Sequence, residues 1–170
     1  LPMTTPSTDA PAPAPLDGVR IVEVASIAAA FAGRQLAELG ADVILVEPPE
    51  GAPTRHRVPY LDQQPGTERS LHHLHYNQGK RSLVLDLDTP EGAATFRRLA
   101  ATADAVIEAE PHGAMDSRNL GFESLRATNP ALLYTTVTPF GQDGPLAAYR
   151  GNDLIGAATS GLMFLNGYPE

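Results

Sequence analysis

Residues 82–108, SLVLDLDTPEGAATFRRLAATADAVIE, decide the fold because they read as a strand, a helix and a second strand in direct succession. The apolar run at 82–87 is typical of a strand. Thr89, Pro90 and Glu91 then form a helix start, with a hydroxyl N-cap, proline at the first helical position and an acid in the first turn. The helix is predicted to reach about residue 103, and a short strand follows at 105–108.

The same alternation continues on both sides of this stretch. Apolar and β-branched runs predict strands at 19–24, 42–47 and 132–138, and helical patterns stand at 28–39, 122–127 and 153–164. The polar segment 48–68 is predicted to be a long loop. The pattern indicates an α/β, Rossmann-like domain in which helices cover both faces of a parallel sheet. Ligands of such sheets bind beyond the carboxyl ends of the strands, so the loops after residues 24, 87, 108 and 138 are expected to form the pocket.

Length and composition set further bounds. The 170 residues suffice for one domain with its own core, which we place at 16–170. Residues 1–15 are rich in proline and alanine, and they are predicted to form a disordered arm, not a signal peptide. The net charge of −8 argues against nucleic acid as the main partner, and no apolar run reaches the length of a membrane span. The chain has no cysteine, which excludes disulfides and a cysteine nucleophile and fits a cytoplasmic enzyme.

The first predicted strand-to-helix turn, residues 25–31 (ASIAAAF), is where a nicotinamide dinucleotide would bind in a Rossmann domain. Glu47 ends the second strand, where a ribose-binding acid stands in dinucleotide sites. The turn has no glycine before Gly33, whereas a pyrophosphate needs glycine there for a tight turn and close backbone approach. NAD is therefore not expected as a cofactor.

Two other chemistries find little support in the sequence. His72 and His75 can share one face of a helix, but no third ligand stands at a recognisable spacing. We therefore expect no metal and interpret these residues, with His73, as solvated loop histidines. Ser160 lacks the G-x-S-x-G elbow of a serine hydrolase.

The stretch 134–162, YTTVTPFGQDGPLAAYRGNDLIGAATSGL, holds the strongest catalytic candidate. An apolar strand leads into a Gly/Pro-rich loop, and Asp153 then stands at the entrance of a helix of small residues. The ordinary structural role of such a carboxylate is an N-cap. Glycine and alanine, however, stand where a packing helix would have leucine, so a bulky ligand can approach the helix backbone.

Five blocks of the sequence, in this order, carry a family resemblance. They are PLDGVRIVEVA (15–25), LAELGADVILVEPPEG (36–51), NQGKRSLVLDLDTPEG (77–92), NPALLYTTVTPFGQDGP (129–145) and GNDLIGAATSGLMFLNGYPE (151–170). Together they resemble the N-terminal portion of the class III CoA-transferase family, also called the CaiB/BaiF family. Members of that family are longer, so the resemblance implies a truncated chain that lacks a second domain and forms an interlocked homodimer at full length.

The resemblance also implies a reaction and a set of site residues. Family members move CoA between an acyl-CoA donor and a carboxylic acid acceptor through a covalent aspartyl intermediate, and Asp153 matches the nucleophile. CoA thus enters as the acyl-CoA substrate. The positions that match CoA contacts in the family are Ala28, Ala29, Leu85, Asp86, Arg118, Thr138, Pro139 and Phe140.

The chain departs from the family pattern at several positions near the expected CoA path. Residues 108–113, EAEPHG, replace the family's E-N-F-x-P-G and leave Glu108 and Glu110 as an acid pair with no identified partner. Asp88 stands where the family has lysine, and Pro48 stands where some members have arginine. Arg118 is next to the usual position of a phosphate-binding arginine and is expected to replace it.

Two alternative functions stay open on the sequence. Acyl-CoA racemases of the same superfamily typically carry Gly-His-Asp where this chain has Gly151-Asn152-Asp153, and an asparagine amide is not a base at neutral pH. A non-catalytic CoA-binding domain is favoured by the altered 108–113 segment and opposed by the intact Asp153. The sequence names neither the donor nor the acceptor acid.

Overall fold

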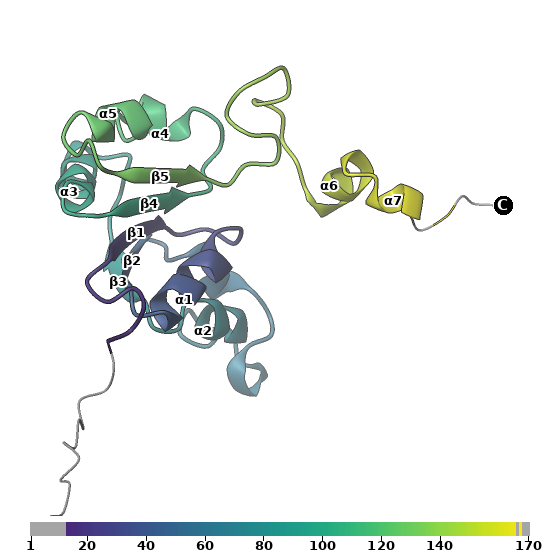
Figure 1. The fold of residues 1–170 in the computed structure, drawn as a ribbon. Helices are drawn as coiled ribbons and strands as arrows, with labels where there is room; N and C mark the ends of the chain where they lie inside the picture. Colours follow the sequence, from purple (N-terminus) through teal and green to yellow (C-terminus); the bar gives the residue numbers. More distant parts are fainter. Residues whose placement is uncertain (1–12, 166, 168–170) are drawn as a thin grey trace, which may run out of the picture.

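The computed structural model describes residues 13–165 and 167, and its centre is a five-stranded parallel sheet (Figure 1). The strands are β1 (Arg20–Val24), β2 (Asp42–Glu47), β3 (Arg81–Val84), β4 (Ala105–Glu108) and β5 (Leu133–Thr136). Their order is β3-β2-β1-β4-β5. This is the strand order of a Rossmann sheet, in which the direction of winding reverses beside β1. The predicted α/β class is confirmed.

Helices lie on both faces of the sheet (Figure 1). They are α1 (Ala30–Glu38), α2 (Leu71–Tyr76), α3 (Pro90–Ala100), α4 (Ala114–Ser117), α5 (Phe122–Arg126), α6 (Asp153–Thr159) and α7 (Leu162–Leu165). α1 and α2 lie on one side of the sheet, and α3, α4 and α5 lie on the other. α6 and α7 lie away from the sheet, at the end of the chain.

The two faces have separate apolar cores because the central strands are apolar on both sides, as parallel strands usually are. Phe96 of α3 and Leu125 of α5 pack with Val22 and Val106 on the larger face. On the other face, Ala29 packs against Ile21 and neighbouring apolar residues of the sheet and α1. Burial of this apolar surface is the main stabilising contribution that holds the domain together.

The predicted start of α3 is confirmed in detail. Thr89 is the N-cap, and its hydroxyl oxygen accepts a hydrogen bond from the Gly92 amide at 3.1 Å. A Cβ on Gly92 would lie 1.8 Å from the Asp86 carbonyl oxygen, so glycine is needed where α3 approaches the end of β3. Three residues therefore fix the entry of α3 beneath the carboxyl edge of the sheet.

Three predicted boundaries are corrected by the structure. α1 begins at Ala30 and not at residue 28, because the Ser26 hydroxyl accepts a hydrogen bond from the Ala29 amide and extends the turn. β3 ends at Val84 and not at residue 87, where its pairing with β2 runs out at Glu47. The last predicted helix is divided in two by Gly161, which has a positive φ of 82°.

The segment predicted as a loop at 48–68 contains two short 3-10 turns, η1 (Pro53–His56) and η2 (Leu61–Gln63), and α2 follows it. Residues 1–12 of the predicted N-terminal arm lie outside the described residues. Of the remaining three, Ala14 lies against the domain, because a Cβ on Gly40 would come within 2.3 Å of its Cβ.

Candidate active site

A groove opens between the end of β5 and α6, and it contains Asp153. We call it the Asp153 groove. Its volume is about 530 Å³. Four of the residues singled out from the sequence line it together with Asp153: Ala28, Thr138, Pro139 and Phe140. Ala28 comes from the turn after β1 and the others from the turn after β5, so the predicted pocket mouth at the carboxyl ends of the strands is where this groove lies.

Asp153 is the first residue of α6, and its carboxylate has no structural task in the described part of the chain. The N-cap is Asn152, whose side-chain oxygen accepts a hydrogen bond from the Ile155 amide at 3.0 Å. The ordinary structural role of such a carboxylate, the N-cap, is therefore already filled by the residue before Asp153. The Asp153 side chain is exposed and makes no hydrogen bond or ion pair with the described residues.

The loop before Asp153 is held against the end of β5 by a close backbone contact. A Cβ on Gly151 would lie 2.5 Å from the Pro139 Cβ and 3.6 Å from the Phe140 ring. Only a residue without a side chain fits there unmoved. The contact brings residue 153 to the groove although Asp153 comes fourteen positions after Pro139 in the sequence.

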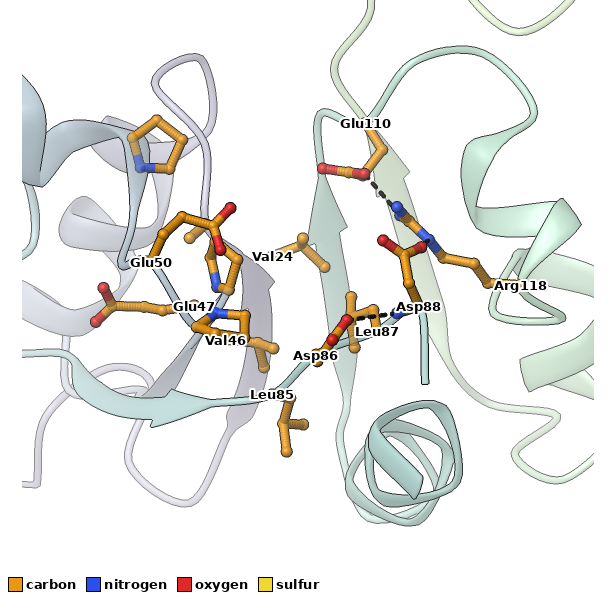
Figure 2. A pocket seen from close by; sticks show the side chains of 14 residues that line it. Val24, Val46, Glu47, Glu50, Leu85, Asp86, Leu87, Asp88, Glu110 and Arg118 are labelled. Carbon is orange, nitrogen blue, oxygen red and sulfur yellow. Dashed lines mark hydrogen bonds and ion pairs between the residues drawn. The ribbon is translucent and has the colours of Figure 1, made fainter. Parts of the chain in front are cut away.

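A second pocket, the Arg118 pocket, lies over the ends of β1, β2 and β3 (Figure 2). Its volume is about 440 Å³, and Leu85, Asp86 and Arg118 line it. Sequence reasoning singled out these three residues as CoA contacts, and the structure brings them together here. The pocket also receives side chains that the prediction did not assign to a site: Glu47, Glu50 and Asp88.

Arg118 is bound on two sides by carboxylates (Figure 2). Its Nε donates to Asp88 Oδ1 and its Nη1 donates to Glu110 Oε2, both at 2.7 Å. The expectation that Glu110 has no partner is therefore wrong. Glu108 also has one, since its Oε2 accepts from the Glu110 amide at 2.6 Å. Among the described residues that line the pocket, Arg118 is the single cation, and the surroundings are acidic.

A third groove of about 470 Å³ lies next to both sites. It shares Glu110 with the Arg118 pocket, and it shares Thr138, Pro139 and Gly151 with the Asp153 groove. The carboxyl edge of the sheet thus carries three neighbouring depressions that share lining residues.

Ala29 is the predicted site residue that lies on neither groove. Its side chain is fully buried in the core beside α1, and its amide donates to Ser26. It therefore supports the turn that presents Ala28. The sequence could not separate the two alanines, because burial depends on where α1 begins.

Glu47 is engaged inside the protein and does not stand free as a ribose ligand would. Arg55 donates to both of its carboxylate oxygens at 2.6 and 2.7 Å, Ser82 donates at 2.5 Å and the Ala52 amide at 2.8 Å. Burial acts to raise the pKa of Glu47, but these hydrogen bonds outweigh it and lower the pKa to about 2. Glu47 is thus an ionised structural anchor for the segment after β2.

The histidines are not in a loop, which corrects that interpretation. They lie on α2, which begins there because Ser70 caps it by accepting from the His73 amide at 3.1 Å. His73 is buried, and its Nδ1 lies 2.7 Å from the Thr54 hydroxyl. No group of three metal-ligating side chains occurs among residues 13–165 and 167.

The fold and this edge define a class of protein: a parallel α/β domain with an elongated ligand groove at the carboxyl ends of its strands and a free carboxylate at one end of the groove. Residues 16–170 match the model of CoA-transferase family III. The chain belongs to this family.

Two curated relatives and one solved structure show the similarity. The chain is 44% identical over 160 residues to a succinate–glutarate CoA-transferase of Agrobacterium fabrum, covering 92% of this chain and 40% of the relative. It is 43% identical over 148 residues to the subunit BbsE of succinyl-CoA:(R)-benzylsuccinate CoA-transferase of Thauera aromatica, covering 87% and 36%. A CaiB/BaiF family protein from Brucella suis superposes with a TM-score of 0.84 at 44% identity, covering 93% and 42%.

This chain therefore spans about two-fifths of the length of the relatives that it matches. Within its described part, none of the helices combines the length and apolar character needed to cross a bilayer.

Proposed function

We propose that the protein transfers CoA between an acyl-CoA and a carboxylic acid, with the Asp153 carboxylate as the nucleophile. The observation that carries the proposal is the free carboxylate of Asp153 on a groove, beside a residue that already caps its helix. A structural aspartate would be expected to make the cap itself. Membership of the family and the names of the relatives support the same reaction class.

The reaction follows as two covalent exchanges. An Asp153 oxygen attacks the thioester carbonyl, the C–S bond breaks, and CoA leaves as a thiolate while the donor acyl group stays on Asp153 as a mixed anhydride. The thiolate then attacks the aspartyl carbonyl, which releases the donor acid and leaves an aspartyl thioester. The acceptor carboxylate repeats these steps in the reverse direction and restores Asp153. Each step exchanges one activated acyl bond for another, which divides a difficult transfer into easier steps.

We assign the binding that this chemistry requires to the three neighbouring grooves. We place the thioester in the Asp153 groove, where Gly156 and Ala157 keep α6 narrow, and the polar end of CoA toward the Arg118 pocket. Holding the ligand along this path orients the carbonyl toward the carboxylate, which lowers the entropic part of the barrier. The acceptor acid is not identified by these residues. Because both relatives are named for succinate or succinyl-CoA, we take succinyl-CoA as the first donor to test.

The racemase alternative has less support in this site. The residue before Asp153 is Asn152, and its side-chain oxygen is engaged as the helix cap. A side-chain amide does not act as a base at neutral pH, so the described lining of the groove lacks the second titratable group that proton transfer beside a thioester would use. Incorporation of deuterium at the α-carbon of an acyl-CoA would revive this alternative.

A degenerate CoA-binding domain without turnover is the second candidate, and the acidic surroundings of Arg118 are the observation that favours it. A phosphate that enters this pocket meets Asp88 and Glu110 around the cation. Binding must then displace or tolerate two carboxylates, which weakens the attraction of the pocket for an anion.

We also propose that α6 and α7 are covered in the protein at its complete natural length. Leu154, Leu162 and Leu165 are 65%, 51% and 79% exposed here. So much exposed apolar surface on one short segment is typical of an interface. This supports the expected interlocked homodimer.

The test compares Asp153→Asn with Asp143→Asn in the protein at its complete natural length. Both changes remove one exposed carboxylate from the same part of the chain, and Asp143 does not line the Asp153 groove. We expect Asp153→Asn to abolish CoA transfer from succinyl-CoA across a panel of carboxylic acids. We expect Asp143→Asn to retain it. Turnover that survives Asp153→Asn would refute the nucleophile.

A further inference from the structure

A lysine and a glutamate form a fully buried ion pair between the sheet and α1. Lys80 Nζ lies 2.7 Å from Glu23 Oε2, and the two side chains are 1% and 0% exposed. Glu23 interrupts the apolar strand β1, and Lys80 directly precedes β3. Neither residue lines a groove described above. The reaction proposed above makes no use of either.

The ammonium of Lys80 joins three elements of the fold. It donates to Glu23 Oε1 of β1 at 2.9 Å, to the Ala30 carbonyl at 2.8 Å and to Asn77 Oδ1 at 2.9 Å. A lysine has three N–H donors, so each finds an acceptor. Ala30 is the first residue of α1 and Asn77 is the C-cap of α2. The lysine therefore ties the first turn of α1 to the sheet and to α2.

The helix lies close to the carboxylate at this point. A Cβ on Gly33 would be 1.7 Å from Glu23 Oε2 and 3.0 Å from Lys80 Nζ. The ion pair thus occupies the space that a side chain at position 33 would need. This contact explains why residue 33, the first glycine after the turn at 25–31, has no side chain.

Stability alone is a poor explanation for the pair. Desolvation of two charges offsets most of their attraction, and apolar residues of similar volume often stabilise a protein as well or better. Burial disfavours the charged form of both groups: it raises the pKa of Glu23 and lowers the pKa of Lys80. The charge of each group opposes the pKa shift of the other. Apolar side chains could not replace the directed hydrogen bonds of Lys80. One of these bonds goes to the backbone carbonyl of Ala30.

That carbonyl lies two residues from the wall of the Asp153 groove. Ala28 lines the groove, Ala29 is locked in the core, and Ala30 receives the Lys80 bond. We propose that Lys80 and Glu23 are positioning residues for CoA transfer, because they fix the first turn of α1 and thereby the position of Ala28 in the wall of the Asp153 groove. This inference rests on the proposed function, and it adds residues that act through the backbone and not by touching the substrate.

The test uses three variants of the protein at its complete natural length. Glu23→Leu with Lys80→Met replaces the pair by apolar groups and removes the bond to Ala30 without leaving an unpaired charge. Glu23→Gln keeps Lys80 and one acceptor oxygen. Leu125→Ala is the control, because it removes a buried side chain from the core on the opposite face of the sheet. Thermal unfolding establishes that each variant is folded.

The first readout is amide hydrogen exchange at residues 28–34, which does not depend on activity. We expect exchange there to quicken by about tenfold or more in the double variant and to change little in Glu23→Gln. The second readout is the split between KM and kcat for succinyl-CoA. We expect KM to rise about tenfold in the double variant, with a smaller change in Glu23→Gln and in Leu125→Ala.

Unchanged amide exchange at residues 28–34 in the double variant would refute the proposal that the ion pair fixes the first turn of α1. Faster exchange with an unchanged KM, or an equal rise of KM in Leu125→Ala, would overturn its role in positioning. The proposed function fails separately, if succinyl-CoA leaves Asp153 unmodified in the unaltered protein. In that case the exchange measurement still tests whether the ion pair fixes the first turn of α1.

Discussion

Gly151 lies against Pro139 so closely that a Cβ at position 151 would come within 2.5 Å of the Pro139 Cβ. This contact joins the turn after β5 to the loop that carries Asp153. The groove exists because these two segments touch, so the position of the carboxylate depends on a residue that has no side chain.

We expect Gly151→Ala to lower kcat/KM for CoA transfer by about ten- to a hundredfold, because Pro139 must move or the 151–153 backbone must shift from the groove. Steady-state kinetics with succinyl-CoA measure the effect. Gly66→Ala is the control, since a Cβ there meets only the flexible Arg69 side chain, at 3.1 Å or more. Equal activity of the two variants would show that the Gly151 contact does not position Asp153.

Asp88→Asn should tighten the binding of CoA. The change removes one of the two carboxylates that hold Arg118 and frees the guanidinium for a phosphate. Because Asp88 is largely exposed, we expect the Kd for CoA to fall only about two- to fivefold. This difference should disappear at high salt. Calorimetric titration with CoA and with pantetheine measures it, and pantetheine should show no gain.

Asp62→Asn is the matched control for that experiment. Asp62 is likewise an exposed partner of an arginine, Arg69, but it lies on η2 and does not line the Arg118 pocket. If both variants bind CoA as the unaltered protein does, Arg118 does not receive the anionic end of the ligand.

Glu47 should make the stability of the protein fall in acid. Its pKa is about 2 in the folded protein, below the ordinary value of 4.5, so its contribution is fully present above about pH 4.5 and is lost as the pH falls toward 2. The shift corresponds to about 3 kcal/mol of unfolding free energy. Urea unfolding between pH 6 and pH 3 should therefore show a shallower pH dependence for Glu47→Gln.

The control for this prediction is Glu68→Gln, the other carboxylate bound to Arg55. Its side chain is 78% exposed. An exposed ion pair contributes little, so the pH dependence should stay close to that of the unaltered protein. A Glu47→Gln variant with the same pH dependence as the unaltered protein would mean that Glu47 is not the anchor of the segment after β2.

The sequence was sufficient for the α/β fold class because the signals were local and agreed with one another. The run around Thr89 predicted a strand, a cap and a helix, and each is present. The strand order depends on long-range pairing, and the alternation of strands with helices limits it to a few arrangements. Boundaries were less accurate at residues 28 and 87, where a single hydroxyl or the end of a neighbouring strand decides them.

The sequence predicted which residues line the candidate site, but it did not predict how they are arranged in space. Eight of the nine positions from the family resemblance, all except Ala29, line either the Asp153 groove or the Arg118 pocket, but the sequence did not divide them between these two sites. The partners of Arg118 come from separate loops, so only the fold brings them together. The cap at Asn152 was missed because asparagine and aspartate serve equally well at that position.

The Lys80–Glu23 pair was also missed, although the sequence holds a signal for it. An acid in the middle of the apolar strand RIVEV needs a buried partner. No local pattern names that partner, which lies 57 residues further along the chain. Pairs of this kind can be expected from a sequence, but their members are found only when the strands are placed side by side.

Covalent capture at Asp153 tests the central claim most directly. The protein at its complete natural length is incubated with succinyl-CoA, treated with hydroxylamine and digested, and the peptide that contains residues 151–160 is analysed by mass spectrometry. We predict a hydroxamate at Asp153 that is absent without succinyl-CoA and absent in Asp153→Asn. An unmodified Asp153 in a protein that is turning over succinyl-CoA would contradict the covalent aspartyl mechanism.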